Sequence, residues 1–220
     1  KKSVRTAKDV KAVFTIQMPD KDDISMNLWM KGEENRDVFT TLSPMTEGLS
    51  RISDMPYNIK EQPTLTFVAR QEGEAWNRPF VAVYEPSSVK EPELIRMVSF
   101  PKVESREEGS HVAVRVDLKD GRRDLLLSSD QAGHECVVGD LKAKAAYALW
   151  RCAEDGNNEL FFLGNGTQMQ VPGMSLKADR NVTVLLERRM DGWYYEASSP
   201  CRLVLDGHKY KLEATSGALL

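Results

Sequence analysis

The chain has 220 residues, of which 41% are hydrophobic and 29% charged, and its 30 basic and 33 acidic side chains leave a formal net charge of -3. This length suits one large β domain or two small ones. The nearly balanced charge does not favour nucleic acid as a partner, because nucleic-acid-binding domains usually carry a basic face. We expect no membrane span and no signal peptide, since no apolar run of the required length occurs.

Short runs of β-forming residues recur along the chain, separated by Gly, Asp, Asn and Pro. Several alternate apolar and polar positions, so that residues such as Val112, Val114 and Val116 share one face of a strand. The strands predicted before residue 102 are 11–18, 24–30, 37–42, 64–70, 80–84 and 95–100. Those predicted after residue 110 are 111–118, 123–128, 135–138, 145–153, 160–163, 182–188, 192–197, 201–205 and 209–214.

Asp-Gly pairs stand between apolar runs at 120–121, 155–156, 191–192 and 206–207. Tight hairpin turns need positive φ angles, which Asp-Gly tolerates, so each pair predicts a hairpin. The stretch 140–148 also has good helix propensity, and a short helix there is the alternative. We favour a strand, because this stretch leads straight into the second Asp-Gly pair.

Many short strands at even spacing predict an all-β fold, made of one or more antiparallel β-sandwiches. Residues 102–110 are charged, contain a glycine and have little to bury. We therefore expect two packed β units, one over 1–104 and a C-terminal one over 111–220. A long loop within a single sandwich is the alternative explanation for this segment.

Three cysteines, Cys136, Cys152 and Cys201, all lie in the second half, and their odd number leaves at least one thiol unpaired. Buried, inert thiols are the simpler interpretation. His134 and Cys136 are the only close His/Cys pair, and two ligands do not make a zinc site. We predict no metal and no cofactor, and a solvent-exposed His208 after the last Asp-Gly pair.

Residues 70–86 are the most informative stretch, because a charged approach around Trp76 turns into an apolar run. An indole can lie against the C–H face of a sugar ring, and an arginine fork binds both oxygens of a carboxylate. The alternative is that Trp76 belongs to the core and that Arg70 pairs with Glu74. The predicted substrate-binding residues are Arg70, Glu74, Trp76 and Arg78. We expect 80–83 to be a central strand buried on both faces.

This stretch, together with 63–67 (Pro-Thr-Leu-Thr-Phe) and 49–51 (Leu-Ser-Arg), resembles the β-rich C-terminal portion of heparinase II/III-like polysaccharide lyases. The resemblance implies an acidic, uronate-containing polysaccharide as substrate and a periplasmic or secreted location. It also implies an N-terminal helical domain, an α/α-toroid, as the partner that supplies most of the catalytic groups in the parent chain.

The resemblance assigns no catalytic residue to this chain, which alone would be inactive and would support the toroid and line the substrate cleft. Lyase chemistry needs a base, an acid and a group that neutralises the carboxylate. Tyr57 and Tyr84 are available as bases, but neither has a His or Arg neighbour in sequence that would complete such a set. The alternative function is a stand-alone carbohydrate-binding or adhesion β-sandwich.

Overall fold

The computed structural model describes residues 4–17, 21–43 and 64–219. The regular elements of the described part are strands and one short 3₁₀ turn. The chain divides into two compact units. The smaller unit comprises Lys1–Val10 and Lys31–Arg78, and the larger unit comprises Lys11–Met30 and Pro79–Leu220.

The smaller unit is built on a three-stranded sheet of order β1-β4-β5. Its strands are β1 (Val4–Arg5), β4 (Arg36–Ser43) and β5 (Thr64–Gln71), followed by the 3₁₀ turn η3 (Ala75–Asn77). The central strand β4 pairs antiparallel with both neighbours, from Arg36 opposite Gln71 to Ser43 opposite Thr64 on the β5 side. The end of β5 and the turn that follows it are therefore anchored to the start of β4.

The larger unit contains a second three-stranded sheet of order β2-β3-β6. Its strands are β2 (Val10–Ile16), β3 (Ile24–Met30) and β6 (Ala82–Ser88). The apolar end of β3, Leu28 to Met30, is buried, and β6 pairs along the whole of β3. Because β6 is the last strand in this order, one of its edges has no ladder partner among the described strands.

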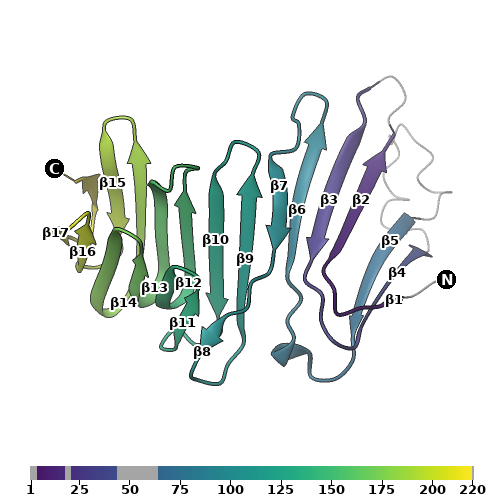
Figure 1. Ribbon diagram of the computed structural model, residues 1–220, viewed down its shortest axis with the longest axis horizontal. Helices are drawn as coiled ribbons and strands as arrows, with labels where there is room; N and C mark the ends of the chain where they lie inside the picture. Colours follow the sequence, from purple (N-terminus) through teal and green to yellow (C-terminus); the bar gives the residue numbers. More distant parts are fainter. Residues whose placement is uncertain (1–3, 18–20, 44–63, 220) are drawn as a thin grey trace, which may run out of the picture. The chain divides into compact units, whose positions relative to one another are not determined.

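The rest of the larger unit is a 12-stranded sheet whose main path runs β17-β16-β14-β13-β12-β10-β9-β7, and this order can be followed in Figure 1. Consecutive strands are mostly neighbours, because tight turns connect them. The strands are β7 (Ile95–Ser99), β8 (Glu104–Ser105), β9 (His111–Leu118), β10 (Arg123–Ser129), β11 (Glu135–Val138), β12 (Leu141–Cys152), β13 (Asn158–Val171), β14 (Met174–Arg189), β15 (Gly192–Ala197), β16 (Cys201–Leu205), β17 (His208–Leu212) and β18 (Ser216–Ala218).

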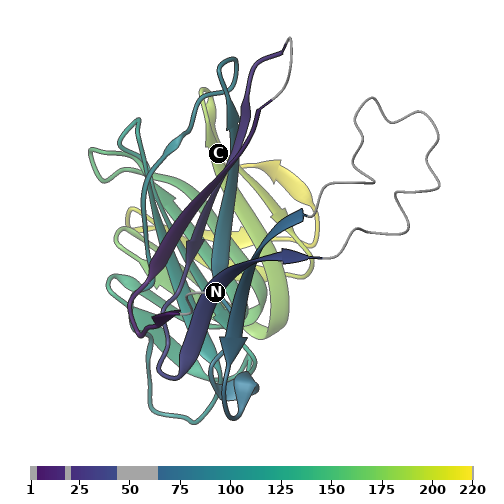
Figure 2. The ribbon, with the colours of Figure 1, turned by 90° about the vertical axis from the view of Figure 1, so that its right-hand side faces the viewer.

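The long strands β12 and β14 each run through both layers that this sheet forms. The first part of β12 pairs with β11 and the second part with β10, while β14 pairs with β16 at its start and with β15 at its end. Side chains from both parts, such as Leu141 and Trp150 on β12, meet in one buried cluster. Figure 2 shows the accompanying twist, with the yellow C-terminal strands running across the direction of the teal strands. The all-β antiparallel sandwich predicted from the sequence is confirmed.

The Asp-Gly hairpins are confirmed, since each pair joins two antiparallel neighbours. Asp206 and Gly207 take φ angles of 49° and 83°, as a two-residue hairpin turn requires. The stretch 140–148 belongs to strand β12 and is not helical. The strands predicted at 160–163 and 182–188 are much longer in the structure, as β13 and β14, and 164–167 is a bulged part of β13.

The predicted strand at 80–84 is wrong in its limits. The structure begins β6 at Ala82 and continues it through Pro86 to Ser88. Proline is tolerated there because β6 is an edge strand, where a missing N–H breaks no ladder. Phe80 precedes the strand and is 50% exposed, so the expectation that 80–83 is buried on both faces is also wrong.

Three sequence features used above, Leu49–Arg51, Tyr57 and Pro63, lie outside the described residues. The division into two β units, 1–104 and 111–220, stays a prediction. In the charged segment 102–110, Glu104 and Ser105 form β8 and pair with β11. In the part of the chain that the structure describes, no helix is long and apolar enough to cross a membrane.

Gly166 gives a direct test of the bulge in β13. A Cβ atom at this position would lie 2.4 Å from Ala145 Cβ and 2.6 Å from the Lys144 carbonyl oxygen. We expect Gly166→Ala to lower the free energy of unfolding by about 1–3 kcal/mol, the usual cost of overpacking. Denaturant titration measures this change. Gly133→Ala is the matched control, since a Cβ there meets no atom within 4 Å, and equal effects of the two variants would contradict the expectation.

Candidate functional site

The guanidinium of Arg36 organises one end of the smaller unit. The residue begins β4 and is only 1% exposed. Its Nε donates to Gln71 Oε1 at 3.0 Å, Nη1 to the Lys31 carbonyl at 2.8 Å and Nη2 to the Arg78 carbonyl at 3.0 Å. Burial lowers its pKa from the ordinary value, although a guanidinium remains charged in proteins. The three bonds fix the end of β5 and the segment around Arg78 against the start of β4.

A second set of charges lies one residue along β4. Asp37 accepts from Arg5 Nε at 3.2 Å and from Arg70 Nη2 at 2.8 Å. The hydrogen bonds from Arg5 and then Arg70 hold the pKa of the Asp37 carboxyl below its usual value. Arg5 also reaches Glu72 Oε2 at 3.0 Å, and its own pKa is raised, first by the hydrogen bond to Asp37. This network ties β1, β4 and β5 together.

The Trp76 turn, residues 72–78, follows this anchored end of β5. Gly73 has a φ of 86°, which allows the chain to leave the strand direction before η3. Asn77 Nδ2 donates to Glu74 Oε2 at 2.9 Å and closes the turn. The Trp76 side chain is 73% exposed, an unusual position for so large an apolar group. Arg78 donates from Nη1 to the Glu34 carbonyl at 3.4 Å.

The structure therefore brings Glu74, Trp76 and Arg78 into one turn and leaves the fourth predicted residue, Arg70, on β5. Trp76 does not belong to the core, and the carboxylate partner of Arg70 is Asp37 and not Glu74. Sequence reasoning missed Arg5 and Asp37, which lie 32 positions apart in the chain and carry no local motif. No sequence signal of the kind used above would have paired them.

This arrangement combines an exposed apolar face with exposed charged groups. An exposed indole supplies a flat apolar face. The Arg70 side chain is 65% exposed, so the part of its fork not used by Asp37 faces solvent. Arginine N–H groups recognise carboxylate or sulfate oxygens in pairs. None of these groups forms a base and acid pair of the kind a lyase requires.

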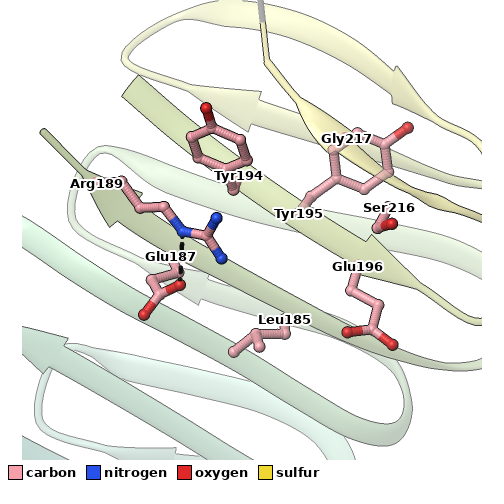
Figure 3. A pocket seen from close by; sticks show the side chains of 8 residues that line it. All are labelled: Leu185, Glu187, Arg189, Tyr194, Tyr195, Glu196, Ser216 and Gly217. Atoms are coloured by element: carbon pink, nitrogen blue, oxygen red, sulfur yellow. Dashed lines mark hydrogen bonds and ion pairs between the residues drawn. The ribbon is translucent and has the colours of Figure 1, made fainter. Parts of the chain in front are cut away.

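A separate pocket of about 440 Å³ lies in the larger unit, on strands β14, β15 and β18 (Figure 3). Arg189 Nε pairs with Glu187 at 3.0 Å, and its guanidinium lies 4.3 Å from the centre of the Tyr194 ring. The Tyr194 hydroxyl donates to Asp191 at 2.6 Å, which raises the tyrosine pKa and lowers the aspartate pKa. The Glu187–Arg189 ion pair and the Asp191–Tyr194 hydrogen bond therefore account for much of the polar wall of this pocket.

The outward face of the larger sheet carries an apolar row. The strand registers place Val114, Leu126, Leu149, Phe162 and Leu185 directly beside one another on five adjacent strands. They are half-buried, except Leu126, which is 38% exposed. The buried core lies on the opposite face, so this row is available for contact with another apolar surface.

The cysteines and histidines take structural positions. Cys136, Cys152 and Cys201 are all free and buried, as expected, and burial raises the pKa of the Cys201 thiol to about 11. His208 is exposed, also as expected. His134 lies against His111, with ring centres 5.8 Å apart, and His111 Nδ1 is 3.0 Å from Ser129 Oγ.

The Asp37 network predicts acid sensitivity of the smaller unit. Because the folded pKa of Asp37 is lowered, its contribution to stability is complete above the unfolded pKa, about 3.9, and is lost as the pH falls through the folded pKa. We expect the NMR signals of the β4 and β5 amides to lose dispersion during acid titration, and Asp37→Asn to remove that step. Asp179→Asn, which removes an exposed pair with Arg202, is the control. An identical titration in wild type and Asp37→Asn would contradict the assignment.

No family model matches the chain. Among curated proteins it is similar to an endo-acting ulvan lyase of Formosa agariphila, with 26% identity over 178 residues, which is 80% of this chain and 20% of the relative. The chain thus spans about a fifth of the length of that relative. The similarity is to part of a polysaccharide lyase.

Proposed function

We propose that this chain is a non-catalytic β region of a larger heparinase II/III-like enzyme that degrades acidic, uronate-containing polysaccharide. In this proposal it lies C-terminal to a helical catalytic domain, supports that domain and lines the substrate cleft. The observation that carries the proposal is the exposed indole of Trp76, flanked by Glu74 and Arg78, in a chain that is similar to a fifth of a polysaccharide lyase.

The Trp76 turn is the proposed polysaccharide contact. Trp76 stacks on a sugar ring, while Arg78 and the free part of the Arg70 fork pair with uronate carboxylates. Glu74 accepts hydrogen bonds from sugar hydroxyls, with its other oxygen held by Asn77. The bonds of Arg36 keep this turn in place before substrate arrives, which reduces the ordering cost of binding.

The supporting role rests on Leu149, Phe162 and Leu185 of the apolar row, since Val114 and Leu126 line a groove on the same face. A face of this kind on a sheet that already has a core on its other side is suited to packing against a second domain. We propose a periplasmic or secreted location, because the chain is similar to part of a polysaccharide lyase.

The alternative is a stand-alone carbohydrate-binding or adhesion module, which the exposed Trp76 supports equally well. The two functions differ in what the larger unit does. In the lyase proposal, adding a purified catalytic domain buries the apolar row and raises turnover of that domain. A stand-alone module binds polysaccharide with the same affinity whether or not the catalytic domain is present, and it leaves the turnover of that domain unchanged.

Substitutions in the Trp76 turn test the binding proposal. Trp76→Ala is expected to cost about 1–2 kcal/mol of binding free energy for a uronate polysaccharide, as truncation of an aromatic anchor does. Arg78→Gln is expected to weaken binding and to reduce its dependence on salt, because one charged contact is lost. Calorimetric titration measures both effects.

Two matched controls separate site effects from general surface effects. Tyr147→Ala removes another exposed aromatic, and Arg106→Gln removes another exposed arginine, both outside the Trp76 turn. Each is expected to bind like wild type. Losses as large in these controls as in the Trp76 turn would show that binding is not located there.

The isolated chain is expected not to cleave uronate polysaccharides, since the described residues that could contact substrate include no base and acid pair. Incubation with such substrates should give no ultraviolet absorbance of an unsaturated uronate. Catalysis by purified chain, abolished by a substitution such as Tyr84→Phe, would overturn the non-catalytic assignment.

A further inference from the structure

An apolar groove of about 940 Å³ lies where the two sheets of the larger unit separate, between β6 and strands β7, β9 and β10. β6 and β7 are both terminal strands of their sheets, and no ladder joins them. The groove walls are mostly apolar. They include Pro86, Leu94, Val114, Val116 and Leu126.

A carboxylate lies in the wall of this groove. Glu85 on β6 is 8% exposed. Its Oε1 accepts from the backbone N–H groups of Leu94 at 2.6 Å and Ile95 at 2.7 Å, which fixes the side chain. Its Oε2 is buried and has no hydrogen-bond partner among the described residues. A buried carboxylate oxygen without a hydrogen-bond donor is costly, so a donor or a cation beside this atom would stabilise it.

A second acceptor stands beside it on the next strand. Asn27 lies directly opposite Glu85 in the β3–β6 pairing, so the two Cβ atoms are about 4.5–5.5 Å apart on one face. Asn27 Nδ2 donates to Glu93 Oε1 at 2.9 Å, and because a carboxylate only accepts, this bond fixes the amide orientation. Asn27 Oδ1 is then a buried acceptor that also has no partner within the described chain.

After the ion pairs within the chain are taken into account, more acidic than basic side chains at the groove remain unpaired. Arg122 is neutralised by Asp120 at 2.6 Å, and Arg151 is held by both oxygens of Asp124, at 2.6 and 2.7 Å. Glu85 and Glu91 line the groove as well, and in the described part of the chain neither has a basic partner. The free charge of the groove is therefore negative, and its complement is a cation with an apolar surround.

From these observations we infer that the groove is a docking site for an apolar protein segment that carries one lysine or arginine, whose charged head bonds to Glu85. An ammonium has three N–H donors, so it can bond to the Glu85 oxygen that lacks a donor. The long alkyl stem of either side chain suits the apolar walls. A uronate polysaccharide is a poor occupant, since its carboxylates would meet two unneutralised glutamates. The inference does not depend on saccharide binding by the Trp76 turn.

A random-peptide display library, selected on the full chain and counter-selected on Glu85→Gln, tests the inference. We expect enrichment of peptides with a single Lys or Arg between apolar residues. The strongest peptide, titrated by NMR, should shift the amide signals of Leu94 and Ile95, whose N–H groups bond to Glu85. Replacing its basic residue by Gln should weaken binding by about tenfold or more, as loss of a buried charge pair does.

Three variants of the chain complete the test. Glu85→Gln and Leu126→Lys, the second of which places a cation at the groove, should each weaken binding of the selected peptide by about tenfold or more. Glu108→Gln, an exposed carboxylate that does not line the groove, should bind like wild type. Amide dispersion in the same spectra shows whether each variant is folded. Failure to enrich basic peptides, or binding that both groove variants leave unchanged, overturns the inference.

Discussion

The larger unit depends on keeping apolar side chains on one face of its longest strands despite breaks in their alternation. Along β12 the buried positions 141, 143 and 145 are followed by 148, 150 and 152, a change from odd to even numbering. A register shift between Lys144 and Ala145 absorbs that change, and β13 shifts around Gly166 opposite it. Without these shifts, one part of each strand would turn its apolar set toward solvent. The same bulges bend the strands, and the bend allows one sheet to form two facing layers.

In the smaller unit a buried charge has the organising role that apolar packing has elsewhere. Arg36 donates hydrogen bonds to two carbonyl oxygens and one side-chain amide oxygen at one end of a small sheet. A three-stranded sheet has little core, so such polar bonds set the position of the turn that follows. The exposure of Trp76 is a consequence, since the turn is held by its backbone and needs no indole anchor in the interior. Fixed backbone and free side chain are what a recognition surface requires.

Local chemistry predicted much of the fold and less of the site. Asp-Gly turns act within a few residues, and the hairpins follow from them. Gly164-Asn165-Gly166 has the same composition as a turn, and only pairing with the distant strands β12 and β14 makes it a bulge. Hydrophobicity alone places Phe80 in the interior, but it precedes β6 and is 50% exposed. For Trp76, the sequence was consistent both with a position in the core and with a position on the surface. The partner of Arg70 is Asp37, which also pairs with Arg5, and no local sequence pattern predicts either contact.

The free, buried cysteines have a consequence for how the chain matures. Burial raises the pKa of all three thiols, so the reactive thiolate is scarce in the folded state. Thiol–disulfide exchange proceeds through the thiolate and needs access to it. In an oxidising compartment the folded sandwich therefore protects its own cysteines, and the vulnerable period is before β12 and β16 close over them. Rapid formation of the local hairpins shortens that period, and a slow-folding variant would accumulate non-native disulfides, which the folded state does not contain.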